Sequence, residues 1–157
     1  MRKIRSLTGM PVLWKGKKLG RLVQAELSKD LGRMEGIWVD CGLMGTRYIT
    51  ADHLSMIGEL AVHSDDKGLR RRCNAAPLLL RAISTDGARI GAAVGAEIDE
   101  LSFIVTALEI THGIWDDLYH GRSRCEAFTP KSEKNEVILA NPANANPDVC
   151  VEGGPEP

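Results

Sequence analysis

Residues 15–27 read KGKKLGRLVQAEL, and residues 86–98, which lie 71 positions further along, read DGARIGAAVGAEI. At this single offset, seven pairs of residues are similar or identical: Gly16/Gly87, Leu19/Ile90, Gly20/Gly91, Val23/Val94, Ala25/Ala96, Glu26/Glu97 and Leu27/Ile98. Chance could produce a Gly-x-x-x-Gly match, but it is not expected to produce seven matches at one offset. After a one-residue deletion the register continues, with residues 37–39 over residues 107–109. The chain is therefore expected to contain two divergent copies of one unit of about 70 residues.

Each copy consists of short apolar runs separated by turns. Before Leu27, apolar and polar residues alternate, which is typical of a strand with one buried face, and Gly16 suits the positive φ of a hairpin turn. Beside this strand, the first copy is predicted to form strands at 11–14, 34–40 and 47–50, a helical turn at 51–54 and a closing segment at 59–63. The second copy is predicted to form strands at 78–83, 90–98, 103–110 and 136–139, with a short helix at 115–121.

These elements predict an all-β protein with two small β-barrels in tandem, because closing short strands into a barrel removes exposed sheet edges. A lone unit of this size is marginal, so the barrels are expected to pack on each other. The predicted boundaries are 1–68 for barrel 1, 69–77 for a linker, 78–140 for a divergent barrel 2 and 141–157 for a disordered, proline-rich tail.

The overall net charge of −1 hides an asymmetry between the two halves. Residues 1–78 carry 14 Lys/Arg and 8 Asp/Glu, whereas residues 79–157 carry 6 and 13. Either the basic and acidic halves attract each other, or the basic half faces an anionic partner.

Cysteine usage and hydropathy indicate a reduced, cytoplasmic setting. The four cysteines have neither CxxC nor Cys/His metal spacing, and they are expected to be free thiols without a role. The sequence has no apolar N-terminal run typical of a secretory signal and no stretch approaching the ~18 apolar residues of a membrane span, so no membrane partner is expected.

The motifs of the first copy resemble those of the PRC-barrel family. They are Leu7–Val12, Gly16-x-x-Leu19-Gly20, residues 25–27, Gly36–Val39, Tyr48–Thr50 and Asp52–Val62. The second copy keeps Asp86-Gly87-x-x-Ile90-Gly91 and Ala96–Asp99, with a poorer closing segment. The resemblance implies compact barrels that serve as docking or assembly modules without shared catalytic residues. Known settings are a photosynthetic reaction-centre subunit, a ribosome maturation factor and stand-alone bacterial proteins, some linked to sporulation; this chain is most similar to the stand-alone group.

The sequence offers no catalytic, cofactor-binding or metal-binding pattern, and no small-molecule substrate is evident. His112 and His120 with Asp116 and Asp117 could be drawn as a metal site, but capping or solvated roles are favoured, since acidic residues suit a helix start. A phosphate-binding role for the glycines at 87, 91 and 95 is disfavoured, because no Lys-Ser/Thr follows and barrel bends explain them.

Five residues are candidates for partner binding. Arg70, Arg71 and Arg72 form a basic triplet that is either a solvated linker or a contact for an anionic surface. Trp38 becomes an interface anchor if its strand face points outward, and Trp115 is the corresponding candidate in the second copy.

The leading hypothesis is a non-enzymatic adaptor that docks a protein partner or forms a homo-oligomer through its barrels. The alternative is an RNA- or ribosome-associated barrel protein that uses the basic first copy and acts in RNA processing or ribosome maturation, although the pI near 6.4 and the scarcity of aromatic residues disfavour nucleic acid. A metal-dependent enzyme is the least favoured option.

Overall fold

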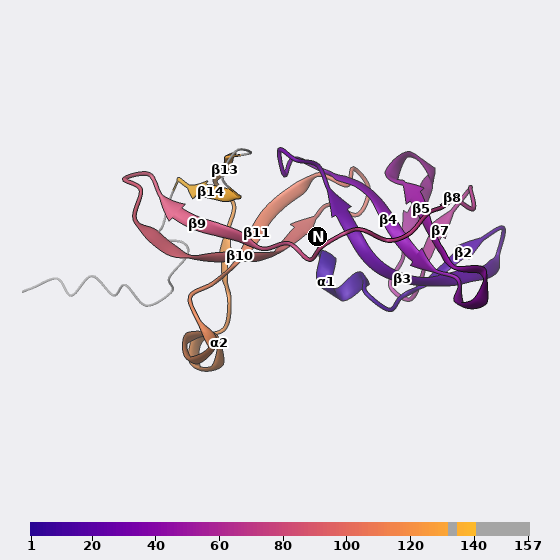
Figure 1. The fold of residues 1–157 in the computed structure, drawn as a ribbon, viewed down its shortest axis with the longest axis horizontal. Helices are drawn as coiled ribbons and strands as arrows, with labels where there is room; N and C mark the ends of the chain where they lie inside the picture. The colour runs from indigo at the N-terminus through magenta and orange to yellow at the C-terminus, as the bar shows by residue number, and fades with distance from the viewer. Residues whose placement is uncertain (132–134, 141–157) are drawn as a thin grey trace, which may run out of the picture.

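Two curled sheets, joined end to end, make up the body of the protein (Figure 1). The structure, a computed structural model, describes residues 1–131 and 135–140. Each sheet curls into a half-barrel, so the prediction of an all-β fold with two barrel-like units is confirmed. The predicted disordered tail at 141–157 lies outside the described residues.

The first sheet is built from the first copy and has the strand order β6-β7-β2-β3-β4-β5-β8. Its strands are β2 Pro11–Trp14, β3 Lys17–Leu27, β4 Met34–Asp40, β5 Thr46–Thr50, β6 Leu54–Ile57, β7 Val62–Ser64 and β8 Leu69–Arg70. Two 3-10 turns, η1 Gly42–Met44 and η2 Ala51–His53, flank β5. The predicted helical turn at 51–54 is therefore confirmed. The predicted closing segment at 59–63 overlaps β7, and β6 precedes it.

The second sheet repeats this order as β12-β11-β10-β9-β14-β13. Its strands are β9 Leu80–Ser84, β10 Arg89–Ile98, β11 Val105–Thr111, β12 Ser123–Cys125, β13 Phe128–Lys131 and β14 Glu136–Leu139. The helix α2, Ile114–His120, lies between β11 and β12, where a short helix was predicted. In both sheets a late hairpin, β6–β7 or β13–β14, returns to the first strand of its copy. The second strand of that hairpin pairs with the first strand in parallel, as β7 with β2 and as β14 with β9.

The strand register preserves the duplication without any deletion. The pairs Ala25↔Ile37 and Ala96↔Leu108 differ by 71 in both members, and the same holds for all six pairs between the central strands. The β-bulges also coincide, between residues 22 and 24 in β3 and between 93 and 95 in β10. The predicted one-residue deletion is wrong, so Trp38 corresponds to Glu109.

One glycine in each copy is required by close approach of the backbone. A Cβ on Gly20 would lie 2.2 Å from the carbonyl oxygen of Asp40, and a Cβ on Gly91 would lie 2.2 Å from that of Thr111. Both glycines sit at a register shift, where the strand bends toward its neighbour. The repeated Gly20/Gly91 match in the sequence therefore reports a steric requirement of the bend.

The two sheets meet through a symmetric pair of backbone hydrogen bonds. The Met34 N–H donates to the Phe103 carbonyl at 2.8 Å, and the Val105 N–H donates to the Gly32 carbonyl at 3.0 Å. Arg33 and Ile104 form the bridge between them. Because Gly32, Arg33 and Met34 correspond to Phe103, Ile104 and Val105, each copy contacts the other through the same segment.

An N-terminal arm reinforces this junction. Strand β1, Arg2–Lys3, pairs with β10 of the second copy, and helix α1, Ile4–Leu7, buries Ile4 and Leu7 in one core that contains residues of both sheets. Arg2 links the copies directly, because its side chain contacts Glu100 at 2.7 Å and the Gly58 carbonyl at 2.9 Å.

These pairings differ from the predicted boundaries at two places. Residues 2–3 belong to the sheet of the second copy although they precede the first. Residues 69–70 form β8 on the edge of the first sheet, within the segment predicted as a linker. The connection between the sheets therefore starts after Arg70.

Gly91→Ala is expected to destabilise the protein by about 2–3 kcal/mol, since the added methyl group has to displace a backbone carbonyl. Chemical denaturation followed by circular dichroism measures this. Gly32→Ala is the matched control, because its new Cβ would meet only the Asp30 carboxylate, at 3.3 Å. Equal stability of the Gly91→Ala variant and wild type would contradict the steric argument.

Asp99→Asn is expected to reduce the loss of stability in acid. Hydrogen bonds from the Ser102 N–H and hydroxyl and the Leu101 N–H lower the pKa of Asp99 in the folded state. A lowered folded pKa adds stability above the unfolded pKa of about 3.9, and this stability disappears as the pH falls through the folded pKa. Thermal melts at about pH 7 and about pH 2.5 give the comparison; an equal drop in the melting temperature of variant and wild type would contradict the prediction.

Candidate functional site

The two copies differ most in the connection that follows β4 in the first copy and β11 in the second. In the first copy, residues 41–45 join β4 to β5 through the short turn η1. In the second copy, residues 112–122 join β11 to β12 and contain α2. Figure 1 shows α2 projecting from the second sheet, away from the first. Any surface specific to the second copy is therefore concentrated on this insertion.

Helix α2 presents its apolar face to solvent. Ile114, Trp115, Leu118 and Tyr119 are 86%, 74%, 70% and 77% exposed. Their spacing of i, i+1, i+4 and i+5 places them on one side of the helix. Large apolar side chains of a short helix normally pack on the body of the protein, so this exposed apolar surface is unusual; it is named the α2 face.

Polar contacts hold α2 in this orientation. The Thr111 hydroxyl donates to Asp117 Oδ2 at 2.6 Å, and Arg122 Nε contacts the same oxygen at 3.4 Å. Gly121 ends the helix at φ 76, and its N–H donates to the Asp117 carbonyl at 3.1 Å. Asp116 lies 3.4 Å from His120 Nδ1 on the exposed side. Asp116 and Asp117 thus lie in the first turn, as predicted.

The hypothesis of a metal site formed by His112, His120 and the two aspartates of α2 gains no support. His112 lies against the Ile90 carbonyl at 3.1 Å and the Ser123 hydroxyl at 3.0 Å, whereas Asp117 contacts Thr111 and Arg122. Within the described ranges, no group of three or more His, Cys, Asp or Glu residues is arranged to hold a metal ion.

Two of the described thiols, those of Cys41 and Cys125, are withdrawn from solvent. Burial raises the pKa of Cys41 and of Cys125 above the usual thiol value. Both are therefore protonated at neutral pH, and a protonated thiol is a poor nucleophile.

Trp38 does not lie on a contact surface. It is 7% exposed, its ring centroid lies 4.8 Å from that of Tyr48, and its Nε1 donates to Glu26 Oε2 at 2.8 Å. The outward-facing condition for an interface anchor is therefore not met. Of the two candidate tryptophans, Trp115 alone is exposed.

The residue corresponding to Trp38 is charged and holds the N-terminal arm on the second sheet. Glu109 is 4% exposed, and its Oε1 lies 2.7 Å from Lys3 Nζ on the N-terminal arm. Gly95, opposite Glu109, leaves the space that the carboxylate fills, because a Cβ there would lie 2.3 Å from Glu109 Oε2. The same sheet position therefore packs an aromatic ring in one copy and an ion pair with the N-terminal arm in the other.

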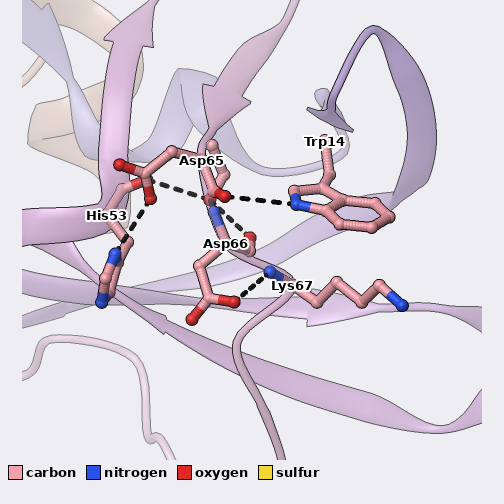
Figure 2. Close-up of polar contacts among 6 residues, drawn as sticks. Trp14, His53, Asp65, Asp66 and Lys67 are labelled. Atoms are coloured by element: carbon pink, nitrogen blue, oxygen red, sulfur yellow. Dashed lines mark hydrogen bonds and ion pairs between the residues drawn. The ribbon is translucent and has the colours of Figure 1, made fainter.

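The arginine triplet follows a corner of hydrogen bonds at the far end of the first sheet (Figure 2). Trp14 Nε1 donates to the Asp65 carbonyl at 3.2 Å, and His53 Nδ1 lies 2.9 Å from Asp65 Oδ1. The Ser64 hydroxyl, which is buried, contacts the carbonyls of His53 and Asp66. This corner fixes the turn from β7 toward β8, and so determines where the triplet lies.

Basic side chains gather around this corner. Lys15 and Lys67 Nζ lie 4.9 and 4.5 Å from the centroid of the Trp14 ring. On the sheet edge, Arg70 is paired with Arg47, and the Arg71 N–H donates to the Thr46 carbonyl at 3.0 Å. Arg70, Arg71 and Arg72 are exposed, and no ion pair involves them in the described part of the chain. We name these six residues, Lys15, Arg47, Lys67, Arg70, Arg71 and Arg72, the basic end.

Comparison with protein-family models found no match for this chain, and comparison with curated proteins found no similar sequence. The PRC-barrel resemblance thus stays a prediction from the motif. No helix in the described ranges is both long and apolar enough to cross a membrane.

The α2 face was only partly visible in the sequence. The short helix and Trp115 were predicted, but Ile114, Leu118 and Tyr119 were not singled out. Their helical spacing signals an amphipathic helix, and such a pattern normally predicts a face turned inward. The length difference between residues 41–45 and 112–122, seen once the copies are aligned, is the signal that could have found this site.

Proposed function

We propose that the chain is a non-enzymatic, cytoplasmic adaptor of the PRC-barrel type, which docks a protein partner through the α2 face. The observation that carries this proposal is the exposure of four large apolar side chains on one side of a projecting helix. The barrels then serve as a rigid support, and the insertion supplies the specificity.

The composition of the α2 face suits a protein partner. Burying a large apolar side chain stabilises a complex by roughly 1.5–3 kcal/mol, and tryptophan and tyrosine are enriched among the residues that dominate binding energy. Trp115 and Tyr119, one turn apart, match the spacing with which a helix inserts anchors into an apolar groove. The exposed Asp116 beside this face disfavours an anionic lipid surface.

Trp115→Ala is expected to abolish partner capture while leaving the fold intact, because the side chain is exposed and makes little contact with the body. Tagged full-length protein is incubated with nuclease-treated lysate of its source cells, and the captured proteins are compared by mass spectrometry. Leu43→Ala is the matched control, since Leu43 is equally apolar and fully exposed on the corresponding connection of the first copy. Unchanged capture by Trp115→Ala would refute docking through the α2 face.

A second candidate function, association with RNA or the ribosome, is favoured by the basic end. Lys15 and Lys67 lie beside Trp14, and Arg47 and the arginine triplet lie along or just after the β5–β8 edge. Contacts of such side chains with phosphates give affinity without base specificity. The half-buried Trp14 ring has two lysines over it, so it is not free to stack on a base.

For this second candidate, replacing Arg70, Arg71 and Arg72 with alanine should weaken binding to a single-stranded RNA and reduce its dependence on salt. Fluorescence anisotropy at about 50 and about 200 mM salt measures both quantities. Lys29→Ala, at an exposed lysine outside the basic end, is the control. Failure of the wild-type protein to bind at the lower salt concentration would exclude this function.

A further inference from the structure

A groove with an apolar floor lies where the two copies meet. One cavity of about 420 Å³ is lined by Leu31 of the first copy, by Leu78 and Leu80 at the start of the second, and by Pro130 of β13. A neighbouring cavity of about 600 Å³ shares Leu31, Leu78 and Leu80 and continues along residues 74–77. Together they form the junction groove, whose cavities fall within the roughly 300–1,000 Å³ range of protein binding pockets.

The rim of the junction groove carries positive charge. Lys29 and Lys131 line it, and neither forms an ion pair with another described residue. Among the described acidic residues that line the two cavities, Glu136 is paired with Arg81 at 3.5 Å, and Glu26 accepts a hydrogen bond from Trp38 at 2.8 Å. The groove therefore suits an apolar segment that carries a carboxylate.

Helix α2 has this combination of side chains. Its apolar face includes Trp115 and Leu118, and Asp116 lies beside them with half of its side chain exposed. The helix cannot reach the groove of its own chain, since no residue of α2 lines either cavity and Figure 1 shows α2 on the opposite side of the second sheet from β13 and β14. Contact between helix and groove thus requires two molecules.

We propose that the α2 face of one molecule docks in the junction groove of a second copy of this chain, with Asp116 facing Lys29 and Lys131. This inference rests on the proposed docking function and names the partner. A symmetric α2–α2 contact fits less well, because α2 contains two aspartates and no lysine or arginine to face them.

Docking of this kind is head to tail. Every molecule offers one helix and one groove, so each added molecule leaves a free helix at one end and a free groove at the other. The contact is small, which places its dissociation constant in the range of about 10–100 µM typical of weak assemblies. Chains that lengthen with concentration are therefore expected.

Sedimentation velocity of the full-length protein from about 1 to about 300 µM tests this, because that range spans the expected dissociation constant. The weight-average mass should rise with concentration. Trp115→Ala should weaken association at least about tenfold, as expected of an anchor residue. The double variant Lys29→Glu/Lys131→Glu should also weaken association, whereas Leu43→Ala should behave like wild type.

A mixing experiment separates head-to-tail from symmetric contact. Trp115→Ala keeps an intact groove, and Lys29→Glu/Lys131→Glu keeps an intact helix, so an equimolar mixture should form dimers that grow no further. If the wild-type protein associates but this mixture of the two variants stays monomeric, the head-to-tail arrangement is wrong. A separate Asp116→Lys protein should bind the groove of the Lys29→Glu/Lys131→Glu protein more tightly than the wild-type protein binds that groove. The reason is that the charges of helix and groove are again opposite.

Two results would overturn the choice of partner. A monomeric protein at every concentration, together with capture of a different protein that depends on Trp115, would refute self-docking and leave the adaptor proposal standing. Binding to lipid vesicles that is lost in Trp115→Ala, without self-association or protein capture, would refute both proposals. Association unaffected by Trp115→Ala would refute self-docking through α2.

Discussion

The structure depends on two backbone hydrogen bonds, from Met34 to Phe103 and from Val105 to Gly32. They join corresponding segments of two copies, so the interface inside this single chain has the self-complementary form of a two-fold homodimer. Each sheet has only about 70 residues with which to build a core, which is marginal for independent stability. The junction turns two marginal cores into one, and Met34, Phe103 and Val105 belong to the buried cluster that both sheets share.

Much of the fold was predictable because the repeat reports steric requirements. Gly20 and Gly91 leave room for a neighbouring carbonyl. The predicted face of Val23, Ala25 and Leu27 is wrong at Val23, which is exposed while Leu22 is buried, because the bulge between residues 22 and 24 changes the face of the strand. These are local effects of neighbouring strands, so they leave a mark on adjacent residues. The strand β14 and the turn η2 were likewise found at or near their predicted positions.

The rest could not be predicted, because it depends on contacts between residues far apart in the chain. Arg2 and Lys3 form a strand only because Glu97 and Ile98 lie beside them, and nothing in the first seven residues indicates that partner. Trp38 and Glu109 correspond in register, yet the identity of one says nothing about the other. For α2, the spacing of Ile114, Trp115, Leu118 and Tyr119 predicts an amphipathic helix, but its outward direction comes from the polar contacts of Asp117.

The pairing of β1 with β10 also has a consequence for the order of folding during synthesis. The first copy leaves the ribosome before residues 89–98 do, so Arg2–Leu7 emerges before the strand with which it pairs is available. During that interval Ile4 and Leu7 lack part of their final surroundings, and the nascent first copy exposes apolar surface at its junction segment. The arm can close only when the second sheet has formed, so residues 2–7, although synthesised before the second copy, are among the last to reach their native contacts.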